Sequence, residues 1–165
     1  CSWGRTRPAR FNKLISQGIE RMTEKNVLIF VRGEQQYEGV EPDVTELMTE
    51  GTMIVAENGD TVLSYQETEL TGMEGTLTCF IIHGDTVTLA RSGAVSSQIV
   101  FQKGKQHSSF YETPWGALTV DETTSCLAMK LGERGGVLEI KYSIAVEHQG
   151  TGRCHFKIRV RERMR

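Results

Sequence analysis

Four charged residues lie on strand faces that are otherwise apolar, and their types are those that bind or react with polar ligands. Arg91 falls on the same alternating positions as the apolar side chains of its segment, and so does Glu122 farther along the chain. Glu67 and Glu69 fall on the same alternating positions as Tyr65. If these faces point inward, an arginine and several carboxylates line one mouth of the fold. Guanidinium is shaped for carboxylate or phosphate, so the pattern predicts a site for a small polar or anionic ligand.

Two other interpretations of these charges stay open. In the first, the charged residues form an internal ion-pair network that closes the end of the fold, which is the commoner use of such charges. In the second, the strands have already ended at those positions. Tyr111 and Trp115 lie at a Pro/Gly corner, where aromatic rings roof a pocket or, more commonly, pack over the end of a barrel. The candidate ligand-binding residues are Arg91, Glu67, Glu69, Tyr65, Glu122, Tyr111 and Trp115.

No motif for catalysis, metal binding or a cofactor stands out in the chain. The four histidines are scattered among turns and strand ends, without an i, i+4 pair or a nearby cysteine, so we predict no metal site. Residues 92–93 and 132–136 lack the spacings of a nucleophile elbow or a phosphate loop. We therefore predict no catalytic residue and no cofactor.

Basic side chains follow one side of the last alternating segment. They are Arg153, His155, Lys157, Arg159, Arg161 and Arg163. A stripe of this kind could track a phosphate backbone. However, few aromatics are interleaved with it, and Glu139, Glu147 or Glu34 on adjacent strands could pair across it. We favour a solvated outer face and expect no nucleic-acid partner.

The elements that must position these residues are β-strands. Apolar and polar side chains alternate with period two, most clearly over residues 138–147, as expected of half-buried strands. The expected strands are Val27–Gln36, Val44–Glu57, Thr61–Leu70, Thr76–Ile82, Thr86–Arg91, Gln98–Gln102, His107–Glu112, Ala117–Lys130, Val137–His148 and Gly152–Arg163.

The connections between these segments are too short for crossover helices, so neighbouring strands must pair antiparallel as a meander. We expect about eight to ten strands in a single antiparallel up-and-down β-barrel, because closure removes exposed edges. A two-sheet sandwich is the alternative. Gly51 predicts a bulge or bend inside a strand, and Asn58-Gly59 predicts a type I′ turn. Residues 12–22 could form a short helix.

Composition places the chain in one ordinary globular domain of 165 residues. No apolar run approaches the length needed to cross a bilayer, so we expect no membrane partner. Cys1, Cys79, Cys126 and Cys154 show no C-x-x-C pair, and we expect reduced core thiols rather than a disulfide. The chain opens without a secretory apolar stretch, and a cytoplasmic location is the simpler interpretation.

Residues 1–21 differ from the rest of the chain in charge and pattern, with five basic residues against one acidic and no period-two alternation. We interpret them as a basic extension upstream of a native start at Met22, and residues 22–165 as the barrel domain. The rival interpretation is a basic arm that binds nucleic acid or a membrane surface.

Three blocks, Ser64–Gly75, Arg91–Val95 and Tyr111–Gly116, together resemble the YwiB-like family of small bacterial proteins of unknown function. The resemblance covers roughly residues 26–163 and implies a calycin-like, that is lipocalin-like, antiparallel barrel. It supplies no catalytic residues. We therefore expect a non-catalytic module that binds a small ligand or a partner. The alternative is an enzyme in which Arg91 with Glu67 or Glu69 works on a small anionic substrate.

Overall fold

The chain folds as a strand meander with one short 3-10 helix, η1. The computed structural model describes residues 22–94, 96–113 and 115–163. The elements are β1 (Met22–Tyr37), β2 (Asp43–Ala56), β3 (Thr61–Gln66), η1 (Glu69–Thr71), β4 (Thr76–His83), β5 (Thr86–Gly93), β6 (Ser97–Gln102), β7 (Gln106–Thr113), β8 (Gly116–Gly132), β9 (Gly135–Val146) and β10 (Gln149–Glu162).

All ten strands of the described chain belong to one antiparallel sheet. Its order is β6-β5-β4-β3-β2-β1-β10-β9-β8-β7, so every strand pairs with its neighbours in sequence, except that β6 and β7 do not pair with each other, and β1 also pairs with β10. The two outermost strands, β6 and β7, pack against each other without a hydrogen-bonded ladder. The predicted single antiparallel up-and-down barrel is confirmed, with a seam between β6 and β7 that leaves it nearly closed.

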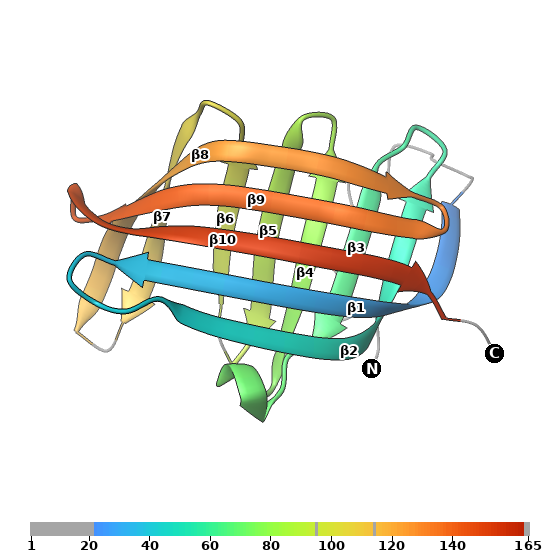
Figure 1. The fold of residues 1–165 in the computed structure, drawn as a ribbon, viewed down its shortest axis with the longest axis horizontal. Helices are drawn as coiled ribbons and strands as arrows, with labels where there is room; N and C mark the ends of the chain where they lie inside the picture. Colours follow the sequence, from blue (N-terminus) through green and yellow to red (C-terminus); the bar gives the residue numbers. More distant parts are fainter. Residues whose placement is uncertain (1–21, 95, 114, 164–165) are drawn as a thin grey trace.

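The sheet folds over so that two sets of strands face each other across the core. Figure 1 shows the long strands β1, β2, β8, β9 and β10 running across one layer, while β3 to β6 cross behind them at a steep angle. We call these the front and back layers. The front layer turns into the back layer through β2, whose residues 52–55 pair with β3 while its whole length pairs with β1.

The core lies between the layers and follows the predicted alternation. Phe80, Phe101, Leu138 and Ile158 have no exposed surface. Aromatic rings join the layers, since the Phe80 ring meets the Phe156 ring edge-on at 6.3 Å between centroids. Such ring pairs add to the stabilisation that burial of apolar area provides. The three described cysteines, Cys79, Cys126 and Cys154, are free.

Local structure departs from the sequence predictions at three places. β3 ends at Gln66 instead of residue 70, because the chain turns into η1, capped by the Thr68 side chain and by Gly72 at φ 73°. Gly51 lies in a regular ladder without a bulge. The Asn58-Gly59 turn is not type I′, since Gly59 has positive φ and Asn58 does not; the Glu147-His148 turn has positive φ at both residues.

Two predictions concern residues that lie outside the described part of the chain. The short helix was placed over residues 12–22, of which only Met22 is described, and it is the first residue of β1. The division of the chain at residues 21 and 22 stays a prediction for the same reason.

Candidate functional site

A row of side chains crosses the inner face of the back layer near one end of the barrel. Tyr65 on β3 lies opposite Thr78 on β4, Thr78 lies opposite Arg91 on β5, and Arg91 lies opposite Ser97 on β6. Directly opposed residues of an antiparallel pair project from the same face. Tyr65 belongs to the main core with Phe80 and Leu89, whereas the other face of these strands buries a separate small cluster of Ile54, Val62 and Ile81, so the face of this row is the interior.

A second row crosses the inner face of the front layer at the same end. Asp43, Gln35, Cys154, Tyr142 and Thr124 are opposed in turn on β2, β1, β10, β9 and β8. Between the two rows lies a cavity of about 250 Å³, which we call the mouth cavity. Its polar wall is formed by Gln35, Asp43, Tyr65, Glu67, Thr71, Arg91, Tyr142 and Cys154.

Glu67 is fixed in the polar wall by hydrogen bonds and an ion pair. It follows β3 directly, and its backbone N–H donates to the Thr76 carbonyl at 2.9 Å. Its carboxylate accepts hydrogen bonds from the hydroxyls of Thr78 at 2.6 Å and Thr71 at 3.0 Å. The Nε of Arg91 lies 3.8 Å from the same carboxylate. A buried charge requires such pairing and hydrogen bonding, and Glu67 therefore neutralises Arg91.

Arg91 keeps one unused donor beside the cavity. Its Nε is buried and has no hydrogen-bond partner among the described residues, since 3.8 Å to Glu67 is too long for a hydrogen bond. Most buried polar atoms in proteins do have a partner. The orphaned Nε has almost no accessible surface, so a ligand acceptor in the cavity would satisfy this donor only after a shift of the Arg91 side chain.

Three tyrosines surround the guanidinium and remain protonated. Burial raises the pKa of Tyr65, Tyr111 and Tyr142, and in each case the positive charge of Arg91 opposes the rise without cancelling it. Burial also raises the pKa of the Cys154 thiol. Protonated phenols donate and accept hydrogen bonds, whereas a thiol without thiolate character is a poor nucleophile. The phenols and the thiol of this wall are therefore suited to binding a ligand.

The opposite part of the mouth cavity is apolar. Val31, Leu47, Met73 and Phe156 line it, and the Phe156 ring stacks on the Tyr142 ring at 6.2 Å between centroids. A cavity with an apolar floor and a few convergent polar groups has the general form of a small-molecule site.

Comparison with known proteins assigns the chain to a family. The family model described as "Domain of unknown function (DUF1934)" matches residues 29–158. The chain belongs to the DUF1934 family. A solved structure, the crystal structure of ywiB protein from Bacillus subtilis, is similar with a TM-score of 0.70 and 20% sequence identity, covering 87% of this chain and 96% of that chain. No curated protein matches.

The DUF1934 match includes every residue that lines the mouth cavity, so the whole site lies within the family domain. The likeness to ywiB shows a shared barrel. Together these findings confirm the resemblance drawn from the three sequence blocks, and neither one names a ligand.

The DUF1934 domain brings together three of the seven predicted site residues, Arg91, Glu67 and Tyr65. Tyr111 is half-buried on β7 and packs against the main core, within electrostatic reach of Arg91. It does not line the mouth cavity. For these residues, strand parity correctly predicted which side chains point inward.

Glu69 and Trp115 lie outside the cavity, contrary to prediction. Glu69 is the first residue of η1 and is exposed, because the strand parity that grouped it with Glu67 ends at Gln66. Trp115 is 92% exposed in the turn between β7 and β8, so it roofs no cavity. Sequence reasoning did not include Tyr142, Cys154 and Thr78 among the site residues. Strand parity placed them inside, but the sequence did not show which residues lie opposite them.

Glu122 forms a separate buried site on β8. It has no exposed surface, and Ser109 donates a hydrogen bond to its Oε1. Its Oε2 has no partner among the described residues. Burial raises the pKa of Glu122, against the lowering effect of the Ser109 hydrogen bond.

Replacement of Glu122 by Gln is therefore expected to stabilise the protein at neutral pH. A raised folded-state pKa means that Glu122 costs stability as the pH rises through that pKa, and costs nothing below the ordinary Glu pKa of 4.5. We expect E122Q to gain about 1 kcal/mol at neutral pH and nothing below pH 4.5, measured by urea denaturation. E133Q, in an exposed turn, is the control. An equal gain at both pH values would contradict the assignment.

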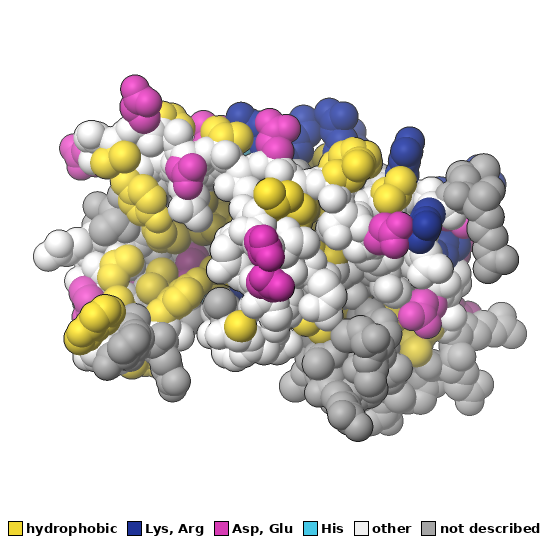
Figure 2. Space-filling view, turned by 90° about the horizontal axis from the view of Figure 1, so that it is seen from below, with side chains coloured by type: hydrophobic (Ala, Val, Ile, Leu, Met, Phe, Trp, Pro, Cys, Tyr) yellow, Lys and Arg dark blue, Asp and Glu magenta, His cyan; other side chains and the backbone are white. Residues whose placement is uncertain are grey.

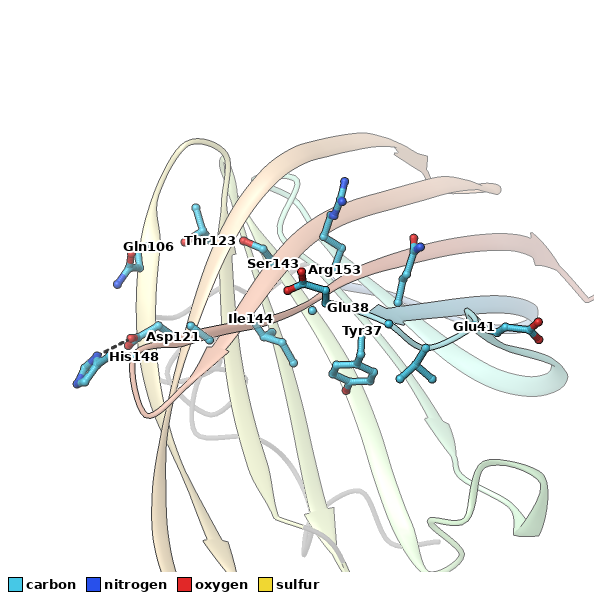
Figure 3. Close-up of a pocket in the computed structure, with 15 residues that line it drawn as sticks. Tyr37, Glu38, Glu41, Gln106, Asp121, Thr123, Ser143, Ile144, His148 and Arg153 are labelled. Atoms are coloured by element: carbon cyan, nitrogen blue, oxygen red, sulfur yellow. Dashed lines mark hydrogen bonds and ion pairs between the residues drawn. The ribbon is translucent and has the colours of Figure 1, made fainter.

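A larger hollow of about 960 Å³ lies beside the β1–β2 turn. Figure 3 shows its labelled side chains spread over an open surface, with Tyr37 and Glu38 on one side and Asp121 bonded to His148 at the far edge. The His148 Nδ1 lies 2.9 Å from Asp121, and hydrogen bonds from Ser108 and His148 lower the pKa of Asp121. Because these polar groups are paired at the rim and do not converge, we favour the mouth cavity as the site.

Among the described residues, no group of three or more His, Cys, Asp or Glu side chains is placed to hold a metal ion. None of the helices in that part of the chain is long and apolar enough to span a membrane.

Proposed function

We propose that this DUF1934 protein is a non-catalytic binding module that holds one small polar molecule in the mouth cavity. The observation that carries the proposal is the buried Nε of Arg91, which has no hydrogen-bond partner among the described residues and belongs to the wall of a cavity. An unsatisfied buried donor costs about 1 to 3 kcal/mol. A ligand acceptor at this position would recover that cost.

The charges of the site restrict the chemistry of the ligand. Glu67 already balances Arg91, Glu34 is paired with Arg32, and Asp43 adds negative charge to the lining. A strongly anionic molecule such as a polyphosphate would meet net repulsion there. The cavity therefore favours a molecule that is neutral or carries a single acidic group. It would place an acceptor near Arg91 and an apolar part against Phe156.

The size of the site points to a small ligand. A volume of about 250 Å³ falls just under the roughly 300 to 1,000 Å³ of pockets that hold drug-sized molecules. The alternative of an enzyme receives less support, because Arg91 is neutralised and the phenols and thiol of the wall have raised pKa values. These groups offer hydrogen bonds but no base or nucleophile active near neutral pH.

The test is a thermal-shift screen of small metabolites followed by calorimetric titration of each hit. Arg91→Gln removes the guanidinium, and R134Q, in the exposed β8–β9 turn, is the matched control. A hydrogen bond to a charged group contributes about 1.5 to 3 kcal/mol, so we expect R91Q to weaken binding by at least about tenfold and R134Q to leave it unchanged. A hit that binds R91Q as tightly as the wild type would remove Arg91 from the site.

A further inference from the structure

The outer face of the front layer carries a row of cations on β10, which lies between β1 and β9. Lys157, Arg159 and Arg161 project outward, opposite to Ile158 and Val160, which are buried in the core. Seen from below in Figure 2, Lys and Arg side chains stand along the upper edge of the molecule, with hydrophobic side chains among them. That edge is the face that Figure 1 turns toward the reader.

Apolar side chains from the neighbouring strands flank this row. Phe30 on β1 lies opposite Arg159 and also opposite Met48 on β2, while Val137 on β9 lies opposite Arg159 from the other side. Met48 is 65% exposed. Together these residues line a surface groove of about 750 Å³. We call it the basic groove and define it by Phe30, Met48, Val137, Lys157, Arg159 and Arg161.

Most carboxylates near the row pair with other groups, but Glu46 lines the groove itself and Glu139 lies opposite Lys157 across the β9–β10 ladder. Glu34 pairs with Arg32 at 3.0 Å, and Glu139 pairs with His155 at 2.9 Å.

Two further carboxylates on the front side are also occupied. Glu50 pairs with Arg163 at 2.9 Å, and Glu147 accepts the backbone N–H of Thr119 at 2.8 Å. Among the described residues, no ion pair includes Lys157, Arg159 or Arg161, although Lys157 lies within electrostatic reach of Glu139. Arg161 instead lies over the Phe30 ring, 5.9 Å from its centroid. The main objection to a phosphate-binding stripe is thereby weakened.

We propose that the basic groove binds single-stranded nucleic acid. Alternate residues of a strand are about 6.6 Å apart, so the three cations form a straight, evenly spaced row that can follow successive phosphates. Proteins that bind single strands without sequence preference combine such a basic track with aromatic side chains on which bases stack. Phe30 is the aromatic residue beside the row, with Arg161 over its ring, and Met48 and Val137 add apolar surface.

Other occupants fit the groove less well. An acidic peptide would satisfy the cations but would leave the apolar floor of Phe30 and Met48 uncovered. Residues 1–21 carry five basic side chains and one acidic, so they would be repelled by the row.

The test is fluorescence anisotropy of the full 165-residue chain with a labelled oligothymidylate of about 20 nucleotides, titrated at several salt concentrations. K157Q/R159Q removes two charges from the groove. K103Q/K105Q removes two from the exposed β6–β7 turn and serves as the matched control. Each phosphate contact on a single strand contributes about 0.7 to the slope of log affinity against log salt. We expect the groove variant to bind at least about tenfold more weakly with a slope lower by about 1.4, and the control to bind as the wild type does.

Several results would overturn the proposal. Equal binding by the groove variant and the wild type would place the contact elsewhere, residues 1–21 included. A labelled polyglutamate peptide that binds the wild type while the oligonucleotide does not would assign the groove to an acidic protein. An abasic oligonucleotide that binds as tightly as oligothymidylate would exclude the apolar floor from recognition. Circular dichroism of both variants shows whether they keep the fold.

Discussion

Replacing Glu67 by Gln is expected to destabilise the protein by about 2 kcal/mol. The substitution keeps the size of the side chain but only one of the two oxygens that accept from the Thr71 and Thr78 hydroxyls, so it removes the charge and one acceptor. Arg91, whose side chain is only 14% exposed, would then lose its nearest counter-charge. Removal of one partner from a fully buried pair typically costs 3 to 5 kcal/mol, and the partial exposure of Arg91 reduces the expected loss.

A double-mutant cycle separates the ion pair from other effects. E67Q, R91Q and E67Q/R91Q are compared by urea denaturation, and the double variant should be more stable than the sum of the single losses predicts, by about 1 kcal/mol or more. Glu69→Gln is the control, because Glu69 is exposed two residues farther along, and it should change stability by less than about 0.5 kcal/mol. Strict additivity of E67Q and R91Q would show that the two charges do not interact.

Replacing Gly51 by Ala is expected to cost about 3 kcal/mol, although the backbone there is ordinary strand. A Cβ at this position would overlap the Cδ1 of Ile29 and the backbone carbonyl oxygen of Ser64, and it would lie 3.3 Å from the Cβ of Tyr65. Ile29 has no exposed surface, and Ser64 is held in β3 between β2 and β4. The methyl group can therefore fit only if β2 and β3 separate.

The matched control is Gly132→Ala near the end of β8, where a Cβ would meet nothing within 4 Å. At such a position alanine restricts the unfolded chain and changes stability by a few tenths to about 1 kcal/mol in the favourable direction. Both variants are measured by urea denaturation. If G51A loses less than about 1 kcal/mol, the close approach of β2 and β3 is wrong. Because Tyr65 lies next to this contact, G51A should also weaken any ligand of the mouth cavity.

Strands, turns and inward faces could be predicted from local sequence. Leu138 and Ile140 alternate with Glu139 and Lys141, and the first two are buried as predicted. Strand parity alone grouped Arg91, Glu67 and Tyr65, and all three line the mouth cavity. The grouping failed for Glu69, because the extended backbone ends before it and the 3-10 helix begins at Glu69 itself.

The rest of the mouth cavity and the pairing of charges beside the basic groove depend on contacts between distant parts of the chain. Tyr142 and Cys154 face Arg91 because β1 pairs with β10 and the front layer folds over the back layer. The choice of His155 as the partner of Glu139, although Lys157 lies directly opposite Glu139 in the ladder, depends on side-chain positions across β9 and β10. The sequence by itself determined the strands and which side chains point inward, since side-chain polarity and turn residues act locally. Only the tertiary structure decided which inward faces meet and which charges pair, because closure of a sheet sets distances between residues more than a hundred positions apart.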